Sequence, residues 1–197
     1  NPLRAEFLVQ AAPAQRFAGR TGPLKVLVVG GSLGAKALNT VVPQALALIP
    51  ADQRPLVTHQ SGEKQIEELR GNYAAAGVQA QLTPFIDNTA QAFADADLVI
   101  CRAGASTVTE IAAVGAPALF VPFPSAVDDH QTHNARFLVD QGGGWLIPQR
   151  ELTPQVLADM LQKTERTTLV SRGLEAKKMQ KLGATAAVVA ACEELCA

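Results

Sequence analysis

Residues 24–35 read LKVLVVGGSLGA, and this stretch decides the fold class. The apolar run over residues 24–29 predicts a buried strand, since a strand covered on both faces shows no polar alternation. A glycine-rich turn at residues 30–34 breaks the run, and an apolar helical pattern follows over residues 35–49. A strand, a glycine turn and a helix in this order form the first half of a βαβ unit.

The rest of the chain repeats this alternation of strands and helices. Further strands are predicted at residues 56–59, 80–85, 98–101, 118–121 and 144–147. Further helices are predicted at residues 63–76, 89–94, 107–114, 129–141, 153–163, 169–181 and 185–195. About six apolar strands that alternate with helices predict an α/β domain, namely a Rossmann-like doubly wound parallel sheet.

This order divides the chain into three parts. Residues 1–23 are rich in proline and glycine and are predicted to be irregular, and we interpret residues 1–22 as an interdomain linker. Because the chain opens on Asn, we expect it to be cut from a longer protein. Residues 23–165 hold the predicted sheet. The helices within residues 166–197 follow without another strand, so they either pack on the sheet or cross to a partner domain.

Composition argues against several classes of protein. The 197 residues are 48% hydrophobic and 18% charged, which is typical of a globular domain and not of a disordered chain. A formal net charge of −1 does not suggest a nucleic-acid partner, and no apolar run reaches the roughly 20 residues of a membrane span. Cys101, Cys192 and Cys196 are odd in number and lack zinc-site spacing, which favours a reducing, cytoplasmic setting.

Polar and glycine residues gather at one edge of the predicted sheet. They follow the first five strands at residues 30–34, 59–62, 85–88, 102–107 and 122–131. Ligands of open parallel sheets bind outside the carboxyl ends of the strands, so we expect the binding site at this edge.

The first of these turns has the composition of a phosphate site. Gly31 and Gly34 allow a tight turn and the close approach of a ligand to the backbone. The following helix start offers free N–H groups, and Ser32 adds a hydroxyl donor. An ordinary strand-to-helix turn explains the same residues equally well. A P-loop lysine is absent, and the second strand lacks the acid that holds an NAD ribose, so neither of those sites is expected.

A second turn of small residues follows the fourth predicted strand. Arg102, Ala105 and Ser106 lie in it, and another set of free amides is expected at the same crevice. Thr107 and Glu110 have the spacing of a capping box, and spacing alone favours that structural role. In the alternative, the Glu110 carboxylate accepts hydrogen bonds from ribose hydroxyls.

The third polar cluster follows the fifth predicted strand. Asp128, Asp129, His130 and Gln131 lie at a predicted helix start. Their spacing matches no known metal site, so a metal is not expected. The acids suit the amino end of a helix, while His130 and Gln131 can hydrogen-bond to sugar hydroxyls. An exposed polar helix start is the simpler alternative.

Six short runs come in an order typical of one family. They are NPLR at residues 1–4, VGGSLGA at 29–35, HQSG at 59–62, FID at 85–87, CRAGASTVTEI at 101–111 and DHQTHNA at 129–135. Together they resemble the bacterial MurG-type N-acetylglucosaminyltransferases of peptidoglycan synthesis, which convert lipid I to lipid II. The likeness covers nearly the whole chain but only the C-terminal half of those enzymes. It implies one half of a GT-B fold, in which two Rossmann-like domains enclose the active site.

The resemblance implies a binding site for UDP-N-acetylglucosamine. Ser32, within the turn that holds Gly31 and Gly34, would contact the diphosphate. The backbone at Ile86 would read the uracil. Glu110 would bind the ribose hydroxyls, which reverses the preference for a capping role.

The remaining site residues would surround the phosphates and the sugar. The amides of residues 105–107, beside Arg102, would supply further donors. Gln131, with His130 next to it, would contact the hydroxyls of N-acetylglucosamine. Arg4 would approach the sugar or the diphosphate from the domain junction.

The implied reaction is inverting transfer of N-acetylglucosamine to the 4-hydroxyl of the muramyl sugar of lipid I. Helix-end amides would stabilise the departing UDP without a metal or another cofactor. The acceptor site and the general base would belong to the N-terminal domain, so no catalytic residue is expected in this chain. The whole enzyme would bind peripherally to the cytoplasmic face of the cell membrane. The alternatives are a GT-B transferase with another sugar or acceptor, and a stand-alone nucleotide-sugar-binding subunit.

Overall fold

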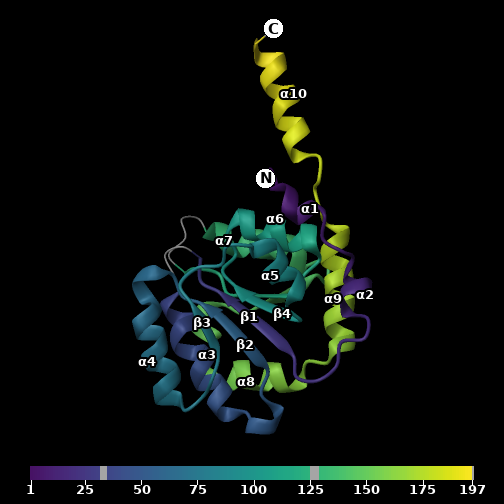
Figure 1. Ribbon diagram of the computed structural model, residues 1–197. Helices are drawn as coiled ribbons and strands as arrows, with labels where there is room; N and C mark the ends of the chain where they lie inside the picture. The colour runs from purple at the N-terminus through teal and green to yellow at the C-terminus, as the bar shows by residue number, and fades with distance from the viewer. Residues whose placement is uncertain (32–34, 125–128, 197) are drawn as a thin grey trace.

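A six-stranded parallel sheet forms the centre of the computed structural model, which describes residues 1–31, 35–124 and 129–196 (Figure 1). Its strands are β1 (Lys25–Val29), β2 (Leu56–Gln60), β3 (Gln81–Thr83), β4 (Leu98–Cys101), β5 (Ala118–Phe120) and β6 (Gly144–Leu146). Their order is β3-β2-β1-β4-β5-β6, and all neighbouring pairs are parallel. The predicted Rossmann-like α/β class is therefore confirmed.

Helices connect the strands and cover the sheet. The longer ones are α3 (Lys36–Leu48), α4 (Ile66–Ala76), α5 (Thr89–Asp95), α6 (Ala105–Val114), α7 (His130–Val139), α8 (Pro154–Lys163), α9 (Arg166–Lys178) and α10 (Ala184–Cys196). Short 3-10 turns lie at η1 (Ala51–Gln53), η2 (Glu63–Gln65) and η4 (Gln149–Glu151). In the described ranges, no helix has the length and apolar character of a membrane span.

Both faces of the sheet are buried, which explains why the strands are apolar throughout. In β4, Leu98 and Ile100 enter a cluster with α3, α4 and α8. Val99 and Cys101 enter a second cluster with α5, α6 and α7. Figure 1 shows these two groups of helices on opposite sides of the sheet. Alternate residues of one strand thus serve two cores, so neither set can be polar.

The amino-terminal segment is helical in two places, so the prediction that residues 1–23 are irregular is wrong. The two helices are α1 (Ala5–Leu8) and α2 (Pro13–Phe17). Pro13 opens α2, where its missing N–H group is no disadvantage. Phe7 is fully buried and packs against Phe93, with 6.3 Å between ring centroids. Helices this short are unstable alone, so tertiary packing decides their formation.

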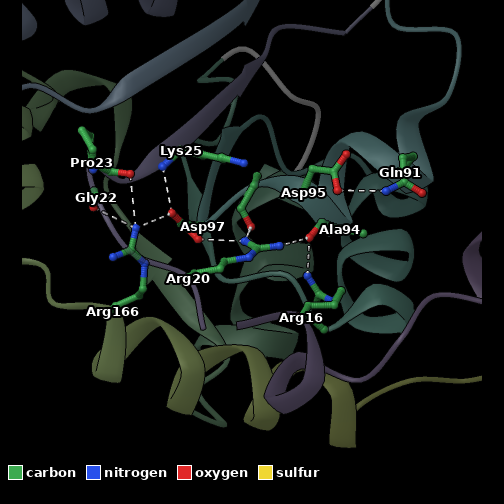
Figure 2. A network of polar contacts seen from close by, with 12 residues as sticks. Arg16, Arg20, Gly22, Pro23, Lys25, Gln91, Ala94, Asp95, Asp97 and Arg166 are labelled. Atoms are coloured by element: carbon green, nitrogen blue, oxygen red, sulfur yellow. Dashed lines mark hydrogen bonds and ion pairs between the residues drawn. The ribbon is translucent and has the colours of Figure 1, made fainter. Parts of the chain in front are cut away.

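A buried carboxylate ties this segment to the sheet (Figure 2). Asp97, the residue before β4, accepts a hydrogen bond of 2.7 Å from Arg20 and one of 2.8 Å from the Lys25 amide. Arg166 of α9 also donates to the Asp97 carboxylate, at 3.2 Å. Asp97 is fully buried, so these donors replace the water that its charge has lost.

Arg16 adds a second attachment, at the carboxyl ends of two helices. It donates 2.8 Å to the carbonyl of Ala94 in α5 and 2.9 Å to that of Val114 in α6. Cations suit such helix ends because the last carbonyls carry partial negative charge. Burial lowers the pKa of Arg16 to about 10, with repulsion from Arg20 as a lesser cause, so the guanidinium stays charged at neutral pH.

The last two helices differ in their surroundings. The first, α9, packs against α2 and α6, and Gly173 lies so close to α6 that a Cβ there would be 2.7 Å from the Gly115 carbonyl oxygen. Only glycine permits this approach. The second, α10, is exposed along most of its length and projects away from the sheet (Figure 1).

Candidate functional site

Two helix starts meet where the order of the strands reverses. Strands β1 and β4 are neighbours, and Val29 at the end of β1 pairs with Cys101 at the end of β4. Helix α3 follows β1 on one face of the sheet, and α6 follows β4 on the other. Their amino ends therefore start from the same edge, at the crevice where open α/β sheets bind ligands.

The turn after β1 needs glycine. Gly31 has a φ of +80°, a left-handed conformation that other residues adopt only with strain. The predicted Ser32 and Gly34 lie outside the described residues. Helix α3 begins after Ala35, which offers no side-chain acceptor to the first turn. The first amides of α3 thus have no capping side chain among the described residues, as a phosphate site requires.

The turn after β4 also leads into an uncapped helix. Helix α6 starts at Ala105, and Gly104 precedes it without a side chain that could cap. Thr107 is consequently the third residue of the helix, not the residue before it. The capping box predicted from Thr107 and Glu110 is therefore wrong. Ala105 and Ser106 are exposed, so the first amides of α6 face solvent at this turn.

Glu110 lies one turn inside α6, beside Arg4. Its carboxylate is 3.6 Å from the Arg4 guanidinium, and only 19% of its side chain is exposed. Burial raises the pKa of Glu110, and Arg4 opposes that shift. Arg4 also lies 5.0 Å from the ring centroid of Phe7, in a cation–π geometry. Packing of α1 against α5 and α6 thus brings the amino-terminal Arg4 to the second turn.

The Gln131 side chain holds the backbone around the second turn. Its Oε1 accepts a hydrogen bond of 3.2 Å from the Ala103 amide and one of 3.0 Å from the Phe123 amide. Because both partners are donors, the oxygen must face them and the NH₂ group points away. Asn134, one turn later in α7, donates 3.0 Å to the Ala103 carbonyl. Ala103 is therefore held at both its N–H and its C=O group.

The residues that begin α7 lie at the surface. His130, the first residue of α7, is exposed. Asp129 precedes it with a φ of +51°, and its side chain accepts a hydrogen bond of 2.7 Å from Thr132 rather than capping the helix backbone. Asp128 lies outside the described residues. The described ranges contain no cluster of three or more potential metal ligands.

Arg102 and Ile86 occupy supporting positions. Arg102 donates to the carbonyls of Val121 and Pro122 and, at 2.6 Å, to Gln149. Burial lowers the pKa of this guanidinium, which is already engaged by the protein. Ile86 follows β3 and packs, half-buried, against the cluster that contains α6. These positions connect the loop after β3 and the loop after β5 to the same edge.

Sequence reasoning missed the roles of the last two residues of β2. His59 was predicted as the last residue of the second strand and Gln60 as the residue after it, but both belong to β2 and both are buried. The run HQSG marked their place without showing where their side chains point. A separate hollow of about 880 Å³ lies over β1 to β3 beside α5, and none of the predicted site residues that the structure describes lines it.

Comparison with known proteins agrees with this geometry. The family model described as Glycosyltransferase family 28 C-terminal domain matches residues 25–191. The chain belongs to this family. The match covers all six strands of the sheet and the helices that begin at the switch point.

Two similar curated proteins have the same name. The chain is 76% identical, over 99% of its length, to the "UDP-N-acetylglucosamine--N-acetylmuramyl-(pentapeptide) pyrophosphoryl-undecaprenol N-acetylglucosamine transferase" of Albidiferax ferrireducens, of which it covers 50%. The protein of the same name from Polaromonas sp. strain JS666 gives the same identity and coverage. The chain thus spans about half the length of the curated relatives it matches.

Solved structures give the same result for the fold. The crystal structure of Acinetobacter baumannii MurG matches with a TM-score of 0.87 and 40% identity, over 95% of this chain and 55% of that one. The glycosyltransferase VinC, solved in complex with dTDP, matches with a TM-score of 0.59 over 94% of this chain and 45% of that one. Its identity is 18%, so that likeness shows the fold alone.

Proposed function

We propose that this family 28 domain binds the sugar donor UDP-N-acetylglucosamine, as one half of a GT-B enzyme that converts lipid I to lipid II. One observation carries the proposal: two helix starts that no described side chain caps, α3 and α6, begin at the same edge of adjacent strands, and Glu110 lies one turn inside α6. The names of the relatives support this choice of donor and reaction.

The proposed orientation of the nucleotide places its diphosphate at the helix starts and its uracil at the loop after β3. The diphosphate lies between the helix starts, where free amides and the partial positive charge of both helices stabilise an anion. Gly31, Ser32 and Gly34 supply the first half of this cradle, and residues 105–107 supply the second. The Glu110 carboxylate accepts hydrogen bonds from the ribose, and the backbone at Ile86 reads the uracil.

The sugar lies towards α7. With its oxygen held by two backbone amides, Gln131 offers only its NH₂ donors to a sugar hydroxyl. His130 lies beside it at the start of α7. Arg102 contributes by fixing the loop after β5, through its contacts with Val121 and Pro122.

The proposed chemistry is inverting transfer with UDP as the leaving group. Fixed amides at the two helix starts stabilise the negative charge that develops on the diphosphate. Arg4 adds positive charge from the segment that precedes the domain. The general base and the lipid I site belong to the other half of the enzyme, so this chain alone carries donor binding and no catalytic base.

The same proposal assigns the parts of the chain. Residues 1–22 form the junction with the other half, residues 23–165 bind the donor, and residues 166–197 are the closing helices. Val188, Val189 and Leu195 are exposed on α10, and this apolar surface suits a helix that crosses to the other half. The whole enzyme acts at the cytoplasmic face of the membrane, where its lipid acceptor lies.

Calorimetric titration of this chain tests the proposal. We expect UDP to bind, UDP-N-acetylglucosamine to compete better than UDP-galactose, and no glycosyl transfer to occur without the other half. Circular dichroism of the same sample establishes that the domain is folded. A folded chain that binds no UDP contradicts the proposal, whereas a preference for UDP-galactose replaces the proposed sugar.

A further inference from the structure

The last two residues of β2 contact the first turn from two sides. Because strand side chains alternate, His59 and Gln60 point to opposite faces of the sheet. His59 reaches α3, which follows the turn, while Gln60 reaches Gly31, which lies within it. Neither side chain is explained by packing alone, since both are polar and almost completely buried.

Gln60 joins two loops through one amide group. Its Oε1 accepts a hydrogen bond of 3.2 Å from the Gly31 amide, and its Nε2 donates 3.1 Å to the Gly31 carbonyl. The same Nε2 donates 2.9 Å to the carbonyl of Pro84, in the loop that leads to Ile86. One side chain thus links the turn proposed for the diphosphate to the loop proposed for the uracil.

His59 holds the helix that leaves this turn. Its two ring nitrogens lie 3.0 Å from the Asn39 side chain in α3 and 3.0 Å from the Tyr73 hydroxyl in α4. Burial lowers the pKa of His59 to about 3, so the ring is neutral throughout the physiological range. Asn39 lies at the start of α3 and also donates 2.8 Å to Gln65. The helix start is therefore fixed independently of Gln60.

We propose that Gln60 is a positioning residue that sets the distance between the diphosphate and uracil subsites. The inference rests on the proposed function and deepens it. It assigns the simultaneous recognition of the base and the diphosphate to a residue that contacts neither of these two groups of the ligand. A preorganised spacing favours a ligand that occupies both subsites over a ligand that occupies one.

The exposure of Gly31 distinguishes a positioning role of Gln60 from a purely structural one. Gln60 is 3% exposed, but Gly31 is exposed, so water can satisfy the Gly31 backbone when Gln60 is replaced. The contacts therefore contribute less to the folded state than to the geometry of the two loops. Gln60→Met keeps the approximate volume of the side chain and removes all three hydrogen bonds.

The test compares UDP and uridine in calorimetric or NMR titrations of the wild-type chain and the Gln60→Met variant. We expect the affinity for UDP to fall by at least about tenfold and the affinity for uridine by less than about threefold. Only UDP occupies both subsites, so only UDP needs the two loops at the correct distance. Gln81→Met is the matched control, since Gln81 is an exposed residue of β3 whose side chain accepts a hydrogen bond from Thr58. It should leave both affinities unchanged.

The possible failures are distinct. If the wild-type chain does not bind UDP, the proposed function fails and this inference with it. If the wild type binds UDP and Gln60→Met binds it equally well, only the positioning role is overturned. Equal losses for UDP and uridine also overturn it. If Gln60→Met does not fold, Gln60→Asn takes its place, because the shorter amide cannot reach both Gly31 and Pro84.

Discussion

The two turns at the switch point present the same chemistry but are supported differently. The turn after β1 depends on a left-handed Gly31 and is held by Gln60, from the adjacent strand. The turn after β4 uses Gly104 in an ordinary extended conformation and is held by Gln131 and Asn134, from α7.

This difference has a consequence for ligand binding. The first turn is fixed by the sheet and by the loop that would read the base. The second turn is fixed by the same Gln131 that would contact the sugar. Nucleotide binding should therefore depend on both turns, whereas discrimination between sugars should depend on the second.

The largest expected effect concerns the second turn. Glu110→Ala should weaken UDP binding about 10- to 150-fold, because hydrogen bonds to a charged group contribute about 1.5–3 kcal/mol. Uracil lacks the ribose, so its binding should change little. Titrations of both ligands check this. Glu6→Ala is the control, since Glu6 is the other acid that contacts Arg4, at 3.2 Å. Equal losses for UDP and uracil would exclude the ribose role.

A smaller effect should separate the two turns directly. Gly31→Ala forces a Cβ into a left-handed conformation, which should lower the free energy of unfolding by about 1–2 kcal/mol and weaken UDP binding. Gly104→Ala is the matched change, because Gly104 has a φ of −62° and a Cβ there meets only Thr107 at 3.8 Å. Urea denaturation of both variants measures the difference. A Gly104→Ala variant as unstable as Gly31→Ala would remove the distinction.

Sugar discrimination should separate two residues of α7. Gln131→Ala and Asn134→Ala both release Ala103, so each should weaken UDP binding by a small factor. Gln131→Ala should also lower the preference for UDP-N-acetylglucosamine over UDP, by about 2- to 12-fold for one neutral hydrogen bond. Competition between the two ligands gives this ratio. If Asn134→Ala lowers it equally, Gln131 acts only through the backbone.

The smallest effect is a shift in pH dependence. UDP binding needs the ionised Glu110, so affinity should fall as the pH drops through the pKa of this carboxyl. Arg4 lowers that pKa against the effect of burial, so Arg4→Ala should move the acidic fall in affinity to higher pH. UDP titrations across the acidic and neutral pH range, from the ordinary Glu pKa upwards, locate the midpoint. Glu110→Gln should leave only the part of the acidic fall that comes from protonation of the UDP terminal phosphate, and an unchanged midpoint in Arg4→Ala would mean that the pair does not form in solution.

The raised pKa of Glu110 also affects folding, with a definite sign. Because the folded state binds the proton more tightly than the unfolded state, the contribution of Glu110 to stability is largest below the unfolded pKa. It is lost as the pH rises through the folded pKa. A mostly buried carboxyl with a raised pKa is typical of a group that serves ligand binding.

Local sequence patterns were sufficient to predict most strands and helices, but not all of the residues at which they begin and end. The apolar run at residues 24–29 and the glycines after it predicted β1 and α3 because hydrophobic periodicity is a local signal. The short helices α1 and α2 escaped prediction because Phe7 and Phe17 stabilise them through distant contacts. The start of α6 was misplaced because the turn geometry at Gly104, not the Thr107 side chain, sets it.

The sequence predicted which residues form the candidate site better than it predicted their contacts. Arg4 and Glu110 were singled out separately, and the structure shows that they pair. Gln131 was expected to face a sugar, but the oxygen of its side-chain amide accepts hydrogen bonds from two backbone amides. Gln60 was assigned no role, because its partners Gly31 and Pro84 are 29 and 24 residues away in sequence.

The sequence by itself determined the α/β class, the alternation of strands and helices, and the edge of the sheet where glycines and polar residues gather. These follow from periodicity and turn composition, which neighbouring residues encode. Only the tertiary structure decided that β1 lies beside β4, that α1 carries Arg4 to Glu110, and that Gln60 links two loops. Such contacts join residues that are far apart in the chain, so they depend on how the whole sheet packs.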